Sequence, residues 1–129
     1  MRLDVVSDVA CPWCAIGVSA LDRALTRIGA DVGEIEVHLQ PFELNPTMGP
    51  EGADAAQYLS EKYGLSPEQL TANRARIAER GAAEGFKFGT RSHVWNTFDA
   101  HRLLFWAGAE GSAGAQLALK RALLQAYHG

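Results

Sequence analysis

The first forty residues alternate between short apolar runs and one longer helical pattern. The apolar run at residues 3–6 is typical of a strand, and its adjacent β-branched pair, Val5 and Val6, predicts a central parallel strand covered on both faces. Residues 35–40 alternate between apolar and polar and predict a second strand. Between the two strands, helical spacing predicts a helix from Pro12 to about Ile28, carried by Val18, Leu21, Leu25 and Ile28.

The rest of the chain follows a helical pattern from about Ala55 to its end. Ser66, Pro67 and Gln69 form a strong helix-start signal, which predicts a helix reaching about Ala83. Asn96 is positioned to cap a further helix. In that helix Phe98, Leu103, Leu104 and Trp106 are expected to belong to the core. The last predicted helix carries the apolar residues Leu117, Leu119, Leu123, Leu124 and Tyr127.

Both cysteines of the chain, Cys11 and Cys14, lie where the first strand turns into the first helix. Residues three apart in a first helical turn share one face, within reach of a disulfide. Pro12 suits this turn because its missing N–H would be unpaired there. The free amides at a helix start stabilise an anion, so we expect a Cys11 thiolate with a lowered pKa. Cys14, one turn deeper, is expected to be less exposed and to resolve mixed disulfides.

The residues between the cysteines set the redox poise of the pair. Trp13 brings bulk and one N–H donor but no positive charge. A histidine at this position would become cationic and stabilise a thiolate further. The sequence therefore predicts an oxidant weaker than the strongly oxidising end of the known scale, at about −120 mV.

Two simpler explanations of the cysteine pair are open. A structural zinc site needs four ligands, and no second cysteine pair exists, so no metal is expected. The histidines lack the spacing of a zinc site and are scattered at positions 38, 93, 101 and 128. A purely structural disulfide is disfavoured because closing so short a loop restricts the unfolded chain little.

Length and charge limit the number of domains, the kinds of partner and the cellular compartment that we expect. The 129 residues suit one domain, and the net charge of −3 without basic clusters argues against nucleic acid as a partner. No apolar run is long enough to span a membrane. Asp4 and Asp8 interrupt the N-terminal apolar stretch, which does not resemble a signal peptide. We therefore expect a cytoplasmic protein, in which a disulfide is more often catalytic than structural.

Four blocks of the sequence together resemble the DsbA-like branch of the thioredoxin superfamily. More narrowly they resemble the FrnE-like subgroup, which is similar to 2-hydroxychromene-2-carboxylate isomerases. The similarity runs over nearly the whole chain. The blocks are Asp8-Val9-Ala10-Cys11-Pro12-Trp13-Cys14, Ile16-Gly17, Pro41-Phe42-Glu43-Leu44-Asn45-Pro46, and Asn96-Thr97-Phe98-Asp99-Ala100-His101-Arg102-Leu103.

This resemblance implies a thioredoxin-like α/β fold with an all-helical insertion. Residues 1–45 would form the N-terminal βαβ part, and residues 46–129 the helical insertion. Family members continue past the insertion into further strands, the first preceded by a cis-proline that faces the cysteines. No proline follows the predicted helices here, and two strands make a poor sheet. We therefore expect a portion of a longer protein, or strands supplied from elsewhere.

The resemblance also implies roles for named residues. It implies thiol–disulfide oxidoreductase activity on protein or small thiol substrates, with Cys11 as nucleophile and Cys14 as resolving thiol. The redox-active disulfide needs no cofactor, although glutathione is a co-substrate in some relatives, and a homodimer is left open. Trp95, Asn96 and His101 are substrate-site candidates, against simpler roles in packing, helix capping and a partly buried polar position.

Two alternative functions remain. The first is a glutathione-dependent isomerase or transferase of the kappa-like class, whose members usually carry serine at the nucleophile position. Cysteine at both ends of the motif favours redox chemistry over this alternative. The second is a non-catalytic binding module.

Overall fold

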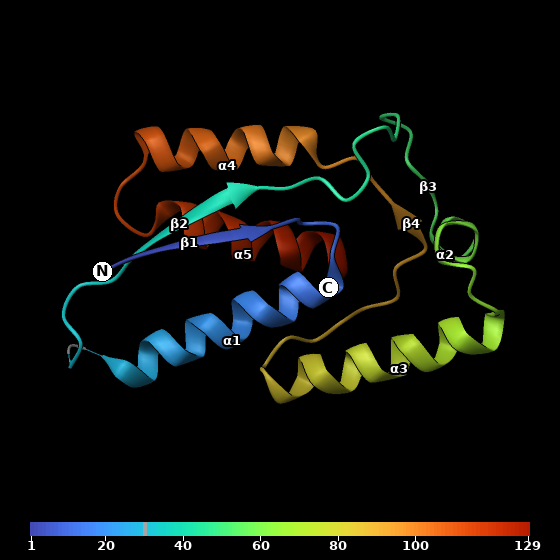
Figure 1. Ribbon diagram of the computed structural model, residues 1–129, viewed down its shortest axis with the longest axis horizontal. Helices are drawn as coiled ribbons and strands as arrows, with labels where there is room; N and C mark the ends of the chain where they lie inside the picture. The colour runs from blue at the N-terminus through green and yellow to red at the C-terminus, as the bar shows by residue number, and fades with distance from the viewer. Residues whose placement is uncertain (30) are drawn as a thin grey trace.

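The computed structural model describes residues 1–29 and 31–129. It shows two small sheets and five helices in these ranges (Figure 1). The elements are, in chain order, β1 (Arg2–Ser7), α1 (Pro12–Ile28), β2 (Glu36–Pro41), β3 (Ala53–Asp54), α2 (Ala55–Tyr63), α3 (Pro67–Ala83), β4 (His93–Val94), α4 (Phe98–Glu110) and α5 (Ala115–His128).

The N-terminal part is a βαβ unit. β1 and β2 pair in parallel, from Arg2 opposite Glu36 to Ser7 opposite Pro41, and α1 connects them. Both predicted strands and the predicted first helix are confirmed within about one residue. Gly17 lies on the exposed side of α1, and a Cβ atom there would meet nothing within 4 Å. Gly17 therefore takes no part in close packing of α1 on the sheet.

The predicted start of α3 is confirmed in detail. Ser66 Oγ accepts the backbone N–H of Gln69 at 3.1 Å, and Gln69 Oε1 accepts the backbone N–H of Ser66 at 2.8 Å. This reciprocal pair is a capping box, and it pairs two amides that the first helical turn leaves free. None of the helices in the described ranges is long and apolar enough to cross a membrane.

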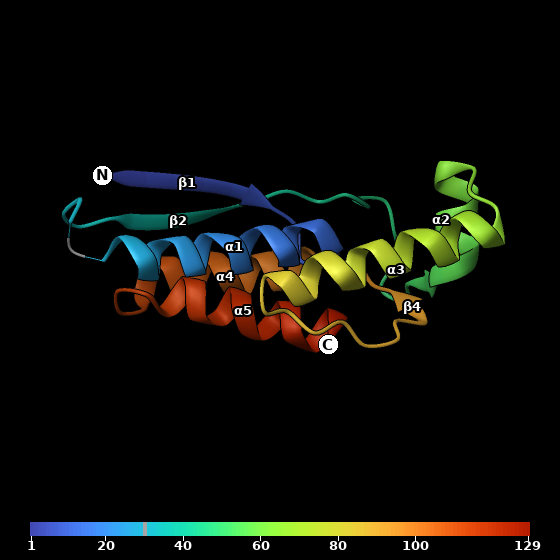
Figure 2. The same cartoon turned by 90° about the horizontal axis from the view of Figure 1, so that it is seen from below.

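The two paired strands form one side of the molecule, and α1, α4 and α5 lie on the other (Figure 2). The side chains of β1 alternate accordingly: Leu3, Val5 and Ser7 are turned toward the helices and are at least half-buried. Val6 points the other way and is 64% exposed. The prediction of a strand covered on both faces is therefore wrong for the described residues, because every helix packed on this sheet lies on the same face.

The core lies between this inner face and the helices, and it includes Val9, Ala15, Val18, Leu39, Phe86, Leu104 and Leu124. In α4 the buried face is formed by His101, Leu104 and Ala107, at helical spacing. Leu104 therefore meets its prediction, whereas Phe98, Leu103 and Trp106 are exposed. These three side chains lie on the other sides of α4. Those sides face solvent because the stripe of His101, Leu104 and Ala107 faces the core.

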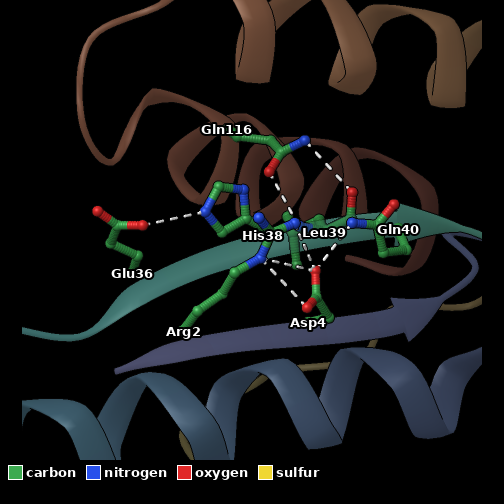
Figure 3. A network of polar contacts seen from close by, with 7 residues as sticks. All are labelled: Arg2, Asp4, Glu36, His38, Leu39, Gln40 and Gln116. Carbon is green, nitrogen blue, oxygen red and sulfur yellow. Dashed lines mark hydrogen bonds and ion pairs between the residues drawn. The ribbon is translucent and has the colours of Figure 1, made fainter.

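Gln116 fastens α5 to the sheet. Its amide accepts the backbone N–H of Leu39 at 2.9 Å and donates to the Leu39 carbonyl at 3.3 Å (Figure 3). The same amide nitrogen donates to the Leu104 carbonyl of α4 at 3.0 Å. The Gln116 side chain thus pairs the backbone N–H and carbonyl of Leu39 at the free edge of β2, and it links α4 and α5 to that edge.

Candidate active site

The two cysteines occupy the first turn of α1. Cys11 is the N-cap residue with an extended backbone, and Pro12 follows as the first helical residue. The backbone N–H of Cys14 donates to the Cys11 carbonyl at 3.1 Å, which closes the turn. Both cysteines are free and half-buried. The expectation that Cys14 is clearly the less exposed of the two is not met.

Nearby backbone amides favour the thiolate form of both cysteines. The N–H groups of Trp13 and Cys14 act to lower the pKa of Cys11, as expected at a helix start. The N–H of Asp8 acts to lower the pKa of Cys14. A negative charge on either sulfur is therefore stabilised by the polypeptide itself.

The two thiols also interact with each other, so they titrate as a pair. Their hydrogen bond lowers the pKa of Cys14 to about 6 and raises the pKa of Cys11. The sequence pointed to a lowered pKa at Cys11. The difference arises because a proton held between two sulfurs favours one thiolate and opposes a second, and Cys14 faces additional positive charge. The pair carries one negative charge at neutral pH.

Asp8 is the hub of the buried polar network beside the dithiol. Its carboxylate is 1% exposed, and it accepts bonds from Thr97 Oγ1 at 2.6 Å and His101 Nε2 at 3.0 Å. It also accepts the backbone N–H groups of Leu44 at 2.8 Å and Ala10 at 3.4 Å. Burial by itself raises the pKa of Asp8, but the bonds from His101 and Thr97 outweigh it and lower the pKa to about 2. Asp8 is therefore ionised, and it ties α4 and the segment after β2 to the dithiol.

Lys120 brings a buried positive charge to the same place. It comes from α5 and is 1% exposed. Burial lowers its pKa, while the charges of Cys14, Asp8 and Cys11 act to raise it. Together with His101 and Pro41 it lines a small cavity of about 10 Å³. The positive charge of Lys120 thus acts to lower the pKa of Cys14.

Two further side chains hold the turn that precedes the dithiol. Arg91 Nη1 donates to the Ala10 carbonyl at 3.1 Å, and its guanidinium lies 5.6 Å from the centre of the Tyr127 ring. His128 Nε2 donates to the Val9 carbonyl at 2.7 Å. Burial lowers the pKa of His128 to about 4, so its ring is neutral at pH 7. The carbonyls of Val9 and Ala10, the two residues before Cys11, are therefore both held by hydrogen bonds.

The other site residues suggested by the sequence are distributed around this cluster. Trp13 is exposed, with the Arg76 guanidinium 5.8 Å from its ring centre. Trp95 is also exposed, and its ring lies 4.0 Å from that of His93. His101 is buried and reaches the dithiol region through Asp8.

Asn96 acts at the start of α4, one residue earlier than a formal N-cap. Its Oδ1 atom accepts the backbone N–H of Phe98 at 2.8 Å, and its Nδ2 atom donates to the Met48 carbonyl at 2.8 Å. Thr97 is the N-cap residue and uses its hydroxyl on Asp8 instead. The structure thus gives Asn96 a positioning role, and its role toward a substrate stays a prediction.

Sequence reasoning missed the roles of Asp8, Thr97, Arg91, Lys120 and His128. One signal was present for Lys120: Leu117, Lys120 and Leu124 recur at helical spacing, which places a lysine on the apolar face of α5. A charge in that position is a reason to look for a functional neighbour.

A larger cavity of about 370 Å³ lies elsewhere, between α1, α5 and the turn after α3. Its rim carries the ion pairs Arg23–Glu84 and Arg121–Asp22, and none of the predicted site residues lines it. Within residues 1–29 and 31–129, no three His, Cys, Asp or Glu side chains are grouped to hold a metal ion. The dithiol cluster is therefore the candidate active site of the domain.

Comparison with known proteins agrees with this geometry. A family model described as "DSBA-like thioredoxin domain" matches residues 2–129. The chain belongs to this family. The expected DsbA-like relationship and thioredoxin-like α/β fold with a helical insertion are confirmed, and the family is one of thiol–disulfide oxidoreductases.

A solved structure supports the same assignment. The chain is similar to a probable DsbA oxidoreductase from Streptomyces coelicolor, with 35% sequence identity and a TM-score of 0.86. The match covers 99% of this chain and 54% of that one, so the DSBA-like chain spans about half the length of its solved relative. The comparison with curated proteins found no match.

Proposed function

We propose that this DSBA-like domain catalyses thiol–disulfide exchange on protein or small-molecule disulfides through Cys11 and Cys14. The observation that carries the proposal is the pair of free thiols in the first turn of a helix, where nearby backbone amides favour a thiolate. A thiolate is the reactive form of cysteine, and this arrangement retains one at neutral pH.

Cys11 is the attacking sulfur and Cys14 the resolving one. Cys11 occupies the N-cap position between the turn at Ala10 and the exposed Trp13. Cys14 lies one turn inside the helix and is influenced by the charges of Lys120 and Asp8, which are both buried. We therefore expect a bulky disulfide substrate to reach the N-cap position, Cys11, first. The proton between the two sulfurs moves to Cys14 as Cys11 attacks.

The cycle balances without a cofactor. The Cys11 thiolate attacks a substrate disulfide, forms a mixed disulfide and releases one substrate sulfur as a thiolate. Cys14 then loses its proton and attacks the Cys11 sulfur. The second substrate sulfur leaves, and the domain is left with a Cys11–Cys14 disulfide. The substrate has gained two electrons, and the reverse sequence oxidises a dithiol.

Trapping the mixed disulfide tests this assignment. In Cys14→Ser, a disulfide substrate labelled with a fluorophore should remain attached through Cys11, because the resolving thiol is absent. Cys11→Ser is the matched control and should trap at least tenfold less label. Equal labelling of the two variants, or none in either, would contradict the proposal.

A further inference from the structure

Two arginine side chains contact the residues on both sides of Cys11 in the chain. Arg91 Nη1 donates to the carbonyl of Ala10, the residue before Cys11, at 3.1 Å. The Arg76 guanidinium lies 5.8 Å from the ring centre of Trp13, which follows Pro12. Arg76 belongs to α3, and Arg91 to the segment between α3 and β4. Two positive charges from a distant part of the chain are therefore held at the start of α1.

Neither of these arginines has an acidic partner in residues 1–29 and 31–129. The arginines that form ion pairs there are Arg2, Arg23, Arg102 and Arg121. A guanidinium carries five N–H donors. Arg91 donates to the Ala10 carbonyl, and Arg76 Nη2 donates to Asn73 Oδ1 at 3.3 Å. Both guanidinium groups therefore keep donors free for an incoming acceptor.

Arg91 is held in place before any substrate arrives. Its guanidinium lies 5.6 Å from the centre of the Tyr127 ring, and Tyr127 Oη accepts the backbone N–H of Trp95 at 2.9 Å. A guanidinium that is already stacked and bonded loses little freedom when it binds a carboxylate, and its planar donors match the two carboxylate oxygens. Arg91 is also half-buried, so its charge is screened less than that of an exposed arginine.

α3 brings Arg76 to the exposed side of the cysteine turn. The C-terminal half of α3 lies beside the start of α1 in both ribbon views (Figure 1, Figure 2). Trp13 is 44% exposed, and Arg76 is exposed as well. The stretch of α3 from Arg74 to Arg80 carries three arginines and one glutamate. A substrate that passes Trp13 on its way to Cys11 therefore meets an excess of positive charge, although the net charge of the chain is −3.

We propose that Arg76 and Arg91 make the domain selective for disulfides that carry carboxylates close to their sulfur atoms. This inference rests on the proposed function and adds the class of substrate to it. The guanidinium groups pair with the substrate carboxylates while the Cys11 thiolate attacks the disulfide. Each turnover consumes one substrate disulfide, forms the Cys11–Cys14 disulfide and releases two carboxylate-bearing thiols, and the arginines keep their protons throughout.

Three small disulfides with the same two-carbon arms test this preference. Dithiodipropionate is anionic, hydroxyethyl disulfide is neutral and cystamine is cationic. The measurement is the rate constant for oxidation of the reduced domain by each disulfide at low ionic strength. Arg76→Gln should slow the reaction with dithiodipropionate about threefold, speed that with cystamine about threefold and leave the neutral disulfide within about twofold. High salt should remove most of these differences.

Arg91→Gln is measured as the ratio of the anionic to the neutral rate, because Arg91 also holds Ala10. This ratio should fall about threefold, and about tenfold when both arginines are replaced. Arg91→Lys keeps the charge and should keep most of the preference, which guards against a variant that folds poorly.

Arg27→Gln is the matched control. Arg27 is exposed in the last turn of α1, about 20 Å from Cys14 at a rise of about 1.5 Å per residue. The substitution changes the net charge as Arg76→Gln does, so any effect of overall charge is common to both variants. We expect all three rate constants to equal those of the wild-type domain.

Two peptide disulfides of equal length, one with glutamate and one with glutamine beside each cysteine, distinguish the sources of the carboxylate. A wild-type preference for the glutamate peptide that Arg76→Gln reduces identifies polypeptide substrates. A preference confined to dithiodipropionate identifies small ones.

The two proposals fail in different ways. If Arg76 only covers Trp13 and Arg91 only holds Ala10, each glutamine variant changes the three rates by the same factor, and the charge preference is overturned while the exchange activity stands. If the reduced wild-type domain is oxidised by none of the three disulfides, the proposed function itself fails, and this inference fails with it.

Discussion

Asp4 and Asp8 lie four residues apart on the same segment, and both accept several hydrogen bonds. Loss of these bonds should nevertheless change the free energy of unfolding little at Asp4 and strongly at Asp8. Asp4 lies on the outer face of β1, where Arg2 donates to it from Nη2 at 3.0 Å and Gln40 from Nε2 at 2.9 Å (Figure 3). Asp8 is enclosed beneath α4 by Thr97 and His101. The bonds are similar in length, and the surroundings differ.

Water explains the contrast between the two carboxylates. Asp4 is exposed, so solvent replaces Arg2 and Gln40 at little cost when either is lost. Asp8 is 1% exposed and has only protein groups around it, so each lost bond leaves a buried polar group unsatisfied. The outer sheet face of this domain is therefore an ordinary surface. The polar network whose disruption should lower stability strongly lies beside the dithiol.

Asp8→Asn should have the largest effect on stability. The neutral amide removes the negative charge beside His101 and Lys120. Its NH₂ group is a donor, so it cannot accept a hydrogen bond from the backbone N–H of Leu44 or Ala10. Breaking a buried ionic network costs about 3–5 kcal/mol of unfolding free energy. Chemical denaturation of the reduced domain measures it. Asp4→Asn is the matched control, and an equal loss in both variants would remove the distinction between the two sites.

Lowering the pH should reduce stability through His128 first and through Asp8 only at more acidic pH. Burial lowers the pKa of His128 from 6.5 to about 4, so the unfolded chain takes up this proton first as the pH falls. Unfolding free energy should therefore decrease between pH 6.5 and 4, by about 3 kcal/mol at 1.36 kcal/mol per unit. The pKa of Asp8 is lowered from 3.8 to about 2, so its contribution is lost only below pH 3.8.

Denaturation at half-unit pH steps, in wild type and His128→Gln, measures these two ranges. Glutamine can still donate to the Val9 carbonyl but does not titrate. Its curve should be flat from pH 6.5 to 4 and fall below that. A variant that keeps the wild-type slope above pH 4 would show that another group causes it.

Thr97→Val tests the shortest bond to Asp8. Valine matches threonine in shape and removes the hydroxyl that donates at 2.6 Å. Leaving a buried carboxylate oxygen short of one donor costs about 1–3 kcal/mol. The pKa of Asp8 should rise, which moves its acid transition upward. Thr97→Ser restores the donor, and stability as low as that of Thr97→Val would contradict this account.

Gln40→Ala should have the smallest effect. It removes the bond from Gln40 to Asp4 on the solvent side of the sheet, where water takes its place. We expect the denaturation midpoint and the redox potential to equal those of the wild-type domain. A measurable change in potential would mean that the outer face is coupled to the dithiol after all.

The parts of the fold that could be predicted are those with local causes. The first strand, α1 and the capping box of α3 follow from apolar spacing and from neighbouring residues such as Ser66 and Gln69. The cysteine pair could be recognised as a redox candidate for the same reason, since its geometry depends on one helical turn.

The rest depends on contacts between distant parts of the chain. Within the part of the chain that the structure describes, Val6 is exposed because no helix covers that face of β1. Trp106 is exposed because it lies outside the inward-facing stripe of α4. Periodicity shows that a helix has an apolar side but not which neighbour that side meets. Lys120 and Cys14 are far apart in sequence, so Pro12 and Trp13, the residues between the cysteines, give no sign of this buried cation.

The most direct test of the account is the ionisation of the two thiols, followed by thiolate absorbance against pH in the reduced domain, with Cys11→Ser and Cys14→Ser alongside. The account predicts a first ionisation with a pKa of about 6 in the wild-type domain, because the thiols share a proton beside backbone amides and Lys120. Each single variant should ionise at higher pH, because the thiol–thiol bond is lost. A first ionisation at about pH 8.5, the value of an ordinary thiol, would contradict it.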